Sequence, residues 1–189
     1  MSGKALSNVV GFDDAPFRHG HRGDVAVVGA VFAGLRLDGV LVGRVRRDGA
    51  NAAPKLAQLV AESRFREHLQ LVLLQGIALA GFNVVDVGDL HRRLGLPILV
   101  VARRAPDLPA MREALYRRVR GGRRKWALIE RLGPMEKVQN VYVQRLGITR
   151  EDADRTLARF AVHGHMPEPL RVAHLIAGAL GHGQSRGRV

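Results

Sequence analysis

The order in which apolar patterns follow one another along the chain most restricts its fold. Three valine-rich segments with the pattern of β-strands open it, at residues 5–12, 25–34 and 39–46, before any helical pattern appears. The link between the second and the third is short and contains Asp38-Gly39, a pair typical of tight turns. The sequence therefore predicts a sheet that begins as a meander, with its second and third strands as antiparallel neighbours.

From residue 52 onward, helical and strand patterns alternate. Leu56, Leu59 and Val60 recur at helical spacing, whereas residues 69–74 form a continuous apolar run typical of a strand covered on both faces. The same criteria predict helices at 52–68, 84–94, 108–119, 149–162 and 167–180, and further strands at 69–74, 96–102 and 138–145.

A meander followed by α/β crossovers predicts an α/β fold with helices on both faces of a mixed, five-stranded central sheet. This is the order of the ribonuclease H-like three-layer fold, although other three-layer α/β folds share it. The 189 residues suit one core, so the whole chain, 1–189, is expected to form a single domain.

Positive charge is concentrated in one segment. The chain has 30 Lys and Arg against 17 Asp and Glu, a net charge of +13, and residues 103–125 alone hold nine basic and two acidic side chains. All but four of the basic residues are Arg, whose guanidinium group binds phosphate oxygens with two hydrogen bonds and stacks on bases. This balance predicts a polyanionic partner, with nucleic acid (DNA or RNA) as the first candidate.

Within that segment, the stretch from Arg117 to Trp126 combines a helix end, a Gly-Gly pair, several cations and the single tryptophan of the chain. Arg123, Arg124 and Trp126 are the candidates for phosphate and base contacts there. Cations at the end of a helix also interact favourably with the helix dipole, so the stretch has a structural interpretation as well.

Cysteine is absent, which excludes disulfides, thiolate nucleophiles and cysteine-ligated zinc. The longest apolar run, residues 25–35, contains two glycines and is too short to cross a bilayer, and the N-terminus lacks a long apolar export segment. We therefore expect a cytoplasmic protein with no membrane partner.

Carboxylates follow two of the predicted strands. Asp13 and Asp14 come directly after the first strand, where they are interpreted either as ligands of Mg²⁺ or as turn residues. Asp48 ends the third strand in Asp-Gly, which favours a turn, and Asp86 lies in the second helical segment, where a solvated position is the simpler interpretation. The candidate metal ligands are therefore Asp13, Asp14, Asp48 and Asp86, and Mg²⁺ or Mn²⁺ is the expected ion.

Eight histidines are present. Two His-Gly-His pairs, at residues 19–21 and 163–165, suit loops and would need a third ligand to hold zinc; solvated loop positions are the simpler interpretation. His174 follows Arg171 by one helical turn and is expected to face the same surroundings, with a packing role as the alternative.

Several motifs resemble a known family. They are Gly11-Phe-Asp-Asp14, the run from Leu74 to Asp86 that contains Ala-Gly-Phe-Asn-Val-Val-Asp, Leu96-Pro-Ile-Leu-Val-Val-Ala-Arg103, Pro167-Glu-Pro-Leu-Arg-Val-Ala-His174 and Gly183-Gln-Ser-Arg-Gly-Arg188. On these motifs the chain resembles, over nearly its whole length, an archaeal family classified as domain of unknown function ninety-nine, which looks like a remote relative of endonuclease V.

The resemblance implies a ribonuclease H-like fold and the chemistry of endonuclease V, which cuts a phosphodiester near a deaminated base with Mg²⁺ held by carboxylates. Asp13 and His174 fall on an Asp and a His of its motifs. Its Asp at the end of the fourth strand falls on Gln75, and for its Glu after the third strand Asp48 is the nearest acid. A two-metal mechanism needs negative ligands on both ions, so Gln75 leaves catalysis open.

Three functions remain open from the sequence. The first is a Mg²⁺-dependent phosphodiester hydrolase in which Asp13 and Asp14 hold the ion and His174 assists protonation or orients the leaving group. The second is a catalytically inactive nucleic-acid-binding protein that keeps the cleft. The third is a hydrolase of small nucleotides or phosphorylated substrates. The candidate substrate-binding residues of the cleft are Gln75, Asn83, Arg103 and Arg171.

Overall fold

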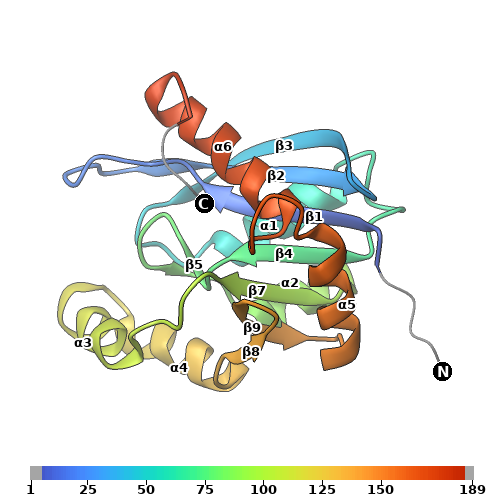
Figure 1. Cartoon of the computed structure of the whole chain (residues 1–189). Coiled ribbons are helices and arrows are strands. Elements are labelled where there is room, and N and C mark those ends of the chain that lie inside the picture. Colours follow the sequence, from blue (N-terminus) through green and yellow to red (C-terminus); the bar gives the residue numbers. More distant parts are fainter. Residues whose placement is uncertain (1–5, 186–189) are drawn as a thin grey trace.

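The chain opens with three consecutive strands, after which helices and strands follow one another singly or in small groups (Figure 1). The computed structural model describes residues 6–185. Its strands are β1 (Asn8–Asp14), β2 (Asp24–Ala33), β3 (Arg36–Arg46), β4 (Leu71–Gln75), β5 (Ala78–Leu79), β6 (Asn83–Val84), β7 (Ile98–Ala102), β8 (Glu136–Val138) and β9 (Val141–Leu146). Its helices are α1 (Ala52–Ala61), α2 (Val87–Leu94), α3 (Leu108–Arg118), α4 (Gly122–Leu132), α5 (Arg150–Phe160) and α6 (Glu168–His182). No helix within these residues is long and apolar enough to cross a membrane.

Seven of the strands form one mixed sheet in the order β3-β2-β1-β4-β7-β9-β8, and β5 pairs with β6 separately. β1, β4 and β7 are parallel to one another, and the other neighbouring pairs are antiparallel. The predicted antiparallel pairing of the second and third strands is confirmed. The prediction that Asp38-Gly39 forms the turn is wrong: Gly34, with φ 59°, and Leu35 make the turn, and Asp38 lies inside β3.

The prediction of a five-stranded sheet is also wrong, because a hairpin of β8 and β9 extends the sheet beside β7. β9 overlaps the strand predicted at 138–145, which the five-stranded arrangement did not include. β8 has three residues, too few for an alternating pattern to appear in the sequence. The two additions make the sheet wider on the side away from β3.

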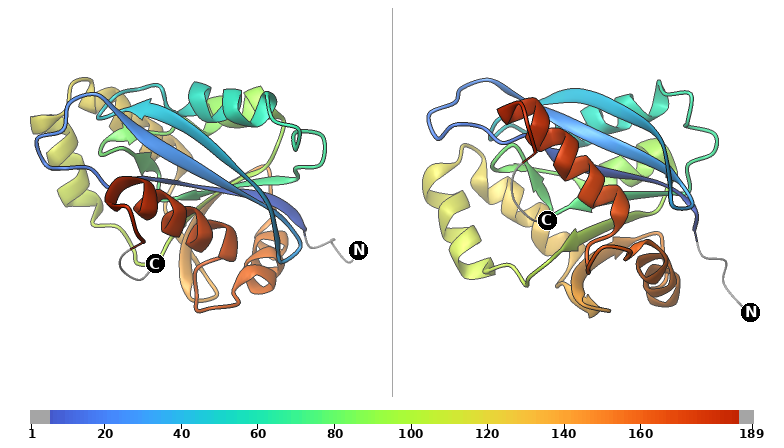
Figure 2. Two further views of the ribbon diagram at one scale, coloured as in Figure 1. Left: turned by 90° about the horizontal axis from the view of Figure 1, so that it is seen from above. Right: turned by 45° about the horizontal axis from the view of Figure 1, so that its top comes forward.

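Helices cover both faces of the sheet, as predicted (Figure 2). α1 packs on β3 and against α2 on one face, and α6 crosses β1 and β2 on the other face. Large side chains such as Phe12, Leu56, Leu74 and Leu170 are fully buried between these layers. Burial on both faces accounts for the continuous apolar sequences of β4 and β7.

Two predicted helices differ in their ends. The helix predicted at 52–68 ends at Ala61, because Ser63 turns back to the Val60 carbonyl with its hydroxyl (2.8 Å) and its N–H (3.2 Å). The helix predicted at 84–94 begins at Val87, because β6 precedes it and Asp86 caps its first turn.

The basic segment contains a helix that the sequence did not predict. α3 ends at Arg118, Gly121 takes φ 72°, and α4 begins at Gly122. A Cβ at Gly122 would lie 1.8 Å from the Leu115 carbonyl oxygen, so only glycine allows the two helices to approach this closely. The α3–α4 hairpin, residues 108–132, lies at the end of the sheet where β7 leads into α3 (Figure 1).

Candidate active site

Polar side chains meet where β1 and β4 end. Phe12 of β1 pairs in parallel with Leu74 of β4. The next residues, Asp13 and Gln75, therefore lie beside each other at the carboxyl ends of these neighbouring strands. Asp14 is the last residue of β1. The carboxyl ends of parallel strands are the usual location of a site in an α/β sheet.

α6 brings His174 to the same edge. The helix lies so close to β1 that a Cβ at Gly11 would be 2.6 Å from the Pro169 carbonyl carbon. His174 Nδ1 lies 2.8 Å from Asp13 Oδ2, a hydrogen bond between residues 161 positions apart. This hydrogen bond with Asp13 raises the pKa of His174 above its usual value.

The two adjacent aspartates have different environments. Asp13 is 6% exposed, and its Oδ1 accepts a hydrogen bond from the Asp14 N–H at 2.9 Å. Burial, and after it the negative charge of Asp13, raises the pKa of Asp14 to about 6, although a backbone hydrogen bond from Ala80 acts in the opposite direction. A carboxyl group with such a pKa in a cleft is typical of functional sites.

Asp13, Asp14, Gln75 and His174 line one open pocket of about 260 Å³, whose wall is completed by Ala15, Pro16, Gly178 and His182. Sequence analysis missed His182, which follows His174 by two helical turns and thus shares its face. The Gln75 Oε1 atom is buried and has no hydrogen-bond partner within the described chain. A buried amide oxygen without a partner is unfavourable, so this atom is available to a ligand.

Asp48 and Asp86, two of the four predicted metal ligands, do not line this pocket. Asp48 Oδ1 accepts a hydrogen bond from the Phe82 N–H at 2.8 Å, and Asp86 Oδ1 accepts one from the Asp89 N–H at 2.9 Å. Both carboxylates are thus hydrogen-bonded to nearby backbone N–H groups. Of the four predicted metal ligands, only Asp13 and Asp14 lie in the pocket. Within residues 6–185, no group of three or more His, Cys, Asp or Glu has the geometry to hold a metal ion.

The predicted substrate-binding residues lie in different places. Gln75 lines the pocket, whereas Asn83 is fully buried and hydrogen-bonded to groups of β3, α1 and the segment that joins them. Arg171 makes two hydrogen bonds to Glu168 on its own helix, at 2.7 and 2.8 Å. Arg103, directly after β7, is exposed. Asn83 and Arg171 therefore stabilise the frame around the pocket.

The α3–α4 hairpin carries stacked arginines. Arg123 lies over the Tyr116 ring, 5.6 Å from its centroid, and Arg112 lies near the Tyr116 and Trp126 rings, at 5.2 and 5.9 Å. Arg124 is exposed. Trp126 is 8% exposed and packs against the core, so it offers no free stacking face, whereas Tyr116 is 41% exposed. Tyr116 is the accessible ring of this surface, and no sequence pattern singled it out.

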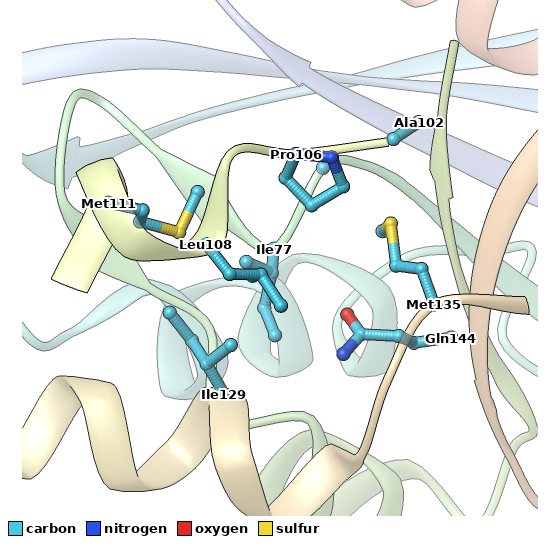
Figure 3. A pocket seen from close by; sticks show the side chains of 9 residues that line it. Ile77, Ala102, Pro106, Leu108, Met111, Ile129, Met135 and Gln144 are labelled. Atoms are coloured by element: carbon cyan, nitrogen blue, oxygen red, sulfur yellow. The ribbon is translucent and has the colours of Figure 1, made fainter. Parts of the chain in front are cut away.

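A second cavity begins one residue beyond Gln75 (Figure 3). Figure 3 shows the Gln144 amide turned toward the interior of this otherwise apolar space. The lining residues come from β7, β9, α3, α4 and the segments that follow β4, β7 and α4: Gly76, Ile77, Ala102, Pro106, Leu108, Met111, Ile129, Met135 and Gln144. Because these residues are scattered over the sequence, no local motif predicts the cavity.

A family model described as endonuclease dU matches residues 6–181. The chain belongs to the endonuclease dU family. A UPF0215 protein of Deinococcus radiodurans is 57% identical over 97% of this chain and 93% of its own length. The crystal structure of a protein of unknown function from Archaeoglobus fulgidus matches with a TM-score of 0.87 and 33% identity, over 94% of this chain and 99% of that chain. The family therefore includes bacterial as well as archaeal proteins.

Endonuclease V structures share the fold of this endonuclease dU family member at lower identity. One is the Ciona intestinalis endonuclease V in complex with a 24mer DNA that contains an inosine followed by a ribo-adenosine. It matches with a TM-score of 0.56 and 14% identity, over 88% of this chain and 82% of that chain. The likeness to the endonuclease V fold that the motifs implied is confirmed.

Proposed function

We propose that this endonuclease dU family member is a metal-dependent endonuclease that hydrolyses phosphodiester bonds in nucleic acid, with deoxyuridine-containing DNA as its substrate. The observation that carries the proposal is the convergence of Asp13, Asp14 and His174 on one open pocket at the carboxyl ends of β1 and β4. The family description suggests the substrate. The likeness to a DNA-bound endonuclease V supports the reaction class and a ribonuclease H-like architecture.

The donor set of the pocket fits a hard divalent ion, Mg²⁺ or Mn²⁺. The carboxylates of Asp13 and Asp14 line the pocket together with the partnerless Oε1 of Gln75, and oxygen ligands of this kind suit these ions. The three residues would hold the ion, which supplies Lewis-acid activation of the scissile phosphate and the attacking water. Because Gln75 brings no charge, the set suits one ion better than two.

His174, oriented by Asp13, is the group that would transfer a proton to the leaving oxygen. With Nδ1 hydrogen-bonded to Asp13, the imidazole is held in one orientation and Nε2 is left for the substrate. The raised pKa of His174 favours the imidazolium form, which can donate a proton to the leaving oxygen.

The arginines of the α3–α4 hairpin are suited to the DNA backbone. Contacts from Arg123 and Arg124 to phosphates would position the duplex without reading its sequence. The hairpin also lines the second cavity through Met111 and Ile129, so DNA held there passes close to that cavity.

The second cavity is the candidate site for the uracil base, and its volume of about 70 Å³ requires the flexible Met111 and Met135 side chains to move aside for the ring to enter. Its wall begins at Gly76, next to Gln75 of the acidic pocket, so a base turned out of the stack would enter it with its phosphate near Asp13. The apolar walls suit the faces of a pyrimidine, and Oε1 of Gln144, whose amide nitrogen donates to the Gly133 carbonyl, can accept an N–H from its polar edge. Met111→Trp, which fills the cavity, is expected to lower cleavage at deoxyuridine.

Cleavage of matched oligonucleotides that contain deoxyuridine, deoxyinosine or neither tests the proposal, in Mg²⁺, Mn²⁺ or EDTA. The wild-type protein is expected to cut the deoxyuridine strand only with a divalent ion. Asp13→Asn and His174→Ala are expected to lower the rate by about 10²-fold or more. Arg150→Ala, on the surface of α5, is the matched control. Absence of cleavage, or cleavage that Asp13→Asn leaves unchanged, would overturn the proposal.

A catalytically inactive nucleic-acid-binding protein is the second candidate. It is favoured by Gln75, a neutral residue at the strand end where the resemblance to endonuclease V implies an Asp. This candidate predicts salt-sensitive binding of the same oligonucleotides, measured by fluorescence anisotropy, with no cleavage in any metal.

A further inference from the structure

The two edges of the seven-stranded sheet differ sharply in length. β8 has three residues, whereas β3 has eleven and is the longest strand of the described chain. An unpaired edge presents a row of backbone N–H and C=O groups, and proteins usually protect such an edge with lysine, proline or an early end to the strand. β3 contains no lysine and no proline, and its charged residues (Arg36, Asp38, Arg44 and Arg46) lie toward its ends, so residues 39–43 are uncharged. No strand of residues 6–185 pairs with its outer edge.

β3 also exposes apolar side chains. Leu37, Val40 and Val42 are 44%, 39% and 55% exposed. On the face opposite α1, α6 covers β1 and β2 and leaves β3 outside its main contacts. A long edge strand with exposed aliphatic residues is typical of a surface that pairs with another strand.

We propose that β3 is a dimerisation strand, which pairs antiparallel with β3 of a second copy of this chain about a two-fold axis at Leu41. The sequence around Leu41 is self-complementary in this register. Val40 then lies opposite the partner's Val42, and Gly39 lies opposite the partner's Gly43, each pair occurring twice. The two seven-stranded sheets become one continuous sheet.

This register contains two pairs of opposite charge, whereas at the ends of the strand Arg36 lies opposite the partner's Arg46, and these two arginines are paired within their own chains with Asp38 and Asp24. Asp38 lies opposite the partner's Arg44, and the two-fold axis repeats the pair, so two carboxylate–guanidinium pairs flank the apolar centre. Asp38 and Arg44 already lie at the surface, on either side of Leu41. A foreign strand without this spacing of charges would not satisfy both.

The helical face of β3 is complementary as well. A Cβ at Gly39 would lie 2.2 Å from the Phe65 ring, and a Cβ at Gly43 would lie 2.6 Å from Leu59 Cδ1, so these partly buried side chains fill the space above the glycines. Because Gly39 opposes the partner's Gly43, Phe65 comes beside the partner's Leu59. The dimer therefore gains apolar contacts on the α1 face in addition to the valine pairs.

Analytical ultracentrifugation over a wide concentration range, with charge reversals on the edge, tests the proposal. The wild-type protein is expected to form a species of twice the 20.7 kDa chain mass. Arg44→Asp places like charges opposite each other twice and should raise the dimer dissociation constant about tenfold or more; Asp38→Arg should do the same, and the double variant Asp38→Arg/Arg44→Asp should restore dimerisation. Arg117→Asp, an exposed reversal on α3, is the control.

A monomeric wild-type protein at all concentrations, or a double variant as weak as the single ones, would overturn the proposal. Circular dichroism of each variant verifies that the fold is intact.

Single cysteines test the register directly, because the chain contains none of its own. Leu41→Cys should form a disulfide-linked dimer on oxidation, since residue 41 faces its own copy across the axis. Val42→Cys, which is more exposed but opposes residue 40, should crosslink much less. Crosslinking of Val42→Cys in preference to Leu41→Cys would contradict the register.

Discussion

Asp13 and Asp14 are adjacent in the sequence, yet their carboxylates have different surroundings in the folded protein. Asp13 has a hydrogen-bond partner at each oxygen, the Asp14 N–H and the His174 ring. Asp14 ionises against burial and against the charge of Asp13. A divalent ion bound by the two carboxylates would offset both the burial of the Asp14 charge and its repulsion by Asp13. Without a metal ion, ionised Asp14 therefore destabilises the folded protein.

Asp14→Asn is therefore expected to stabilise the metal-free protein. Folding raises the pKa of Asp14 from 3.8 to about 6, so the wild-type protein loses stability as pH rises through this range. The variant loses none from this position, because its amide does not ionise. In EDTA, the free energy of unfolding should match the wild type below about pH 4 and exceed it by roughly 1–3 kcal/mol above about pH 6.5. Urea unfolding at several pH values measures the difference. A gain that is the same at every pH would contradict this origin.

Gln75→Asp is expected to tighten metal binding. The substitution turns a neutral oxygen into a third negative group in the pocket, which should increase the affinity for Mn²⁺ about tenfold. Isothermal titration calorimetry measures the change. Gln58→Asp, at an exposed position of α1, adds the same charge elsewhere and should leave the affinity unchanged.

At the scale of elements, the short β5–β6 hairpin (residues 78–84) is held from three sides. The Ala80 backbone is hydrogen-bonded to Asp14, and Asp48 accepts from the Phe82 N–H. From α4, Lys125 Nζ donates to the carbonyl oxygens of Asp48 (2.5 Å) and Phe82 (2.8 Å). The hairpin thereby connects the basic helices to the strand end that carries the acidic pocket.

Lys125→Met is expected to destabilise the protein by about 2–3 kcal/mol. Lys125 is 5% exposed, and the substitution removes both hydrogen bonds from its ammonium group. The carbonyl oxygens of Asp48 and Phe82 then lack a donor. Urea unfolding at neutral pH measures the loss. Arg124→Met, at the neighbouring exposed position, should change stability little. Equal effects of the two substitutions would show that the ammonium contacts contribute nothing.

Local patterns predicted the elements that are long and regular. β1, β2, β3, β4 and β7 all lie where valine and leucine runs indicated them, but β8 and α4 did not show because one is too short and the other begins inside a Gly-rich basic stretch. The motifs singled out Asp13 and His174, which the structure brings together in one pocket. Asp48 and Asp86 lie outside this pocket and accept hydrogen bonds from the N–H groups of Phe82 and Asp89, contacts that the local sequence did not reveal.

At the scale of the molecule, about half of the excess positive charge lies in one short segment, most of it on the α3–α4 hairpin. Residues 103–125 carry nine of the 30 basic side chains, and α3 and α4 stand at the end of the sheet where β7 leaves it (Figure 1). The second cavity joins this hairpin to the end of β4. The basic segment and the acidic pocket therefore lie at the same end of the sheet, which is the arrangement that the proposed DNA substrate requires.

Arg123→Gln combined with Arg124→Gln is expected to weaken DNA binding and its salt dependence. Each lost phosphate contact should reduce the slope of log affinity against log salt by about 1. Fluorescence anisotropy at several salt concentrations measures the slope. Arg92→Gln with Arg93→Gln, exposed on α2, removes the same charge elsewhere and should alter the slope much less. Similar effects of the two pairs would indicate a general attraction without a defined surface.

The hydrogen bond between Asp13 and His174 spans 161 positions of the chain. During translation β1 emerges early and α6 late, so the ribosome releases a nearly complete sheet before the histidine is available to it. The nascent chain therefore carries Asp13 and Asp14 on a nearly complete sheet while the pocket still lacks its imidazole. Synthesis order therefore completes the pocket last, and a chain that stops before α6 lacks both its imidazole and the wall that Gly178 and His182 provide.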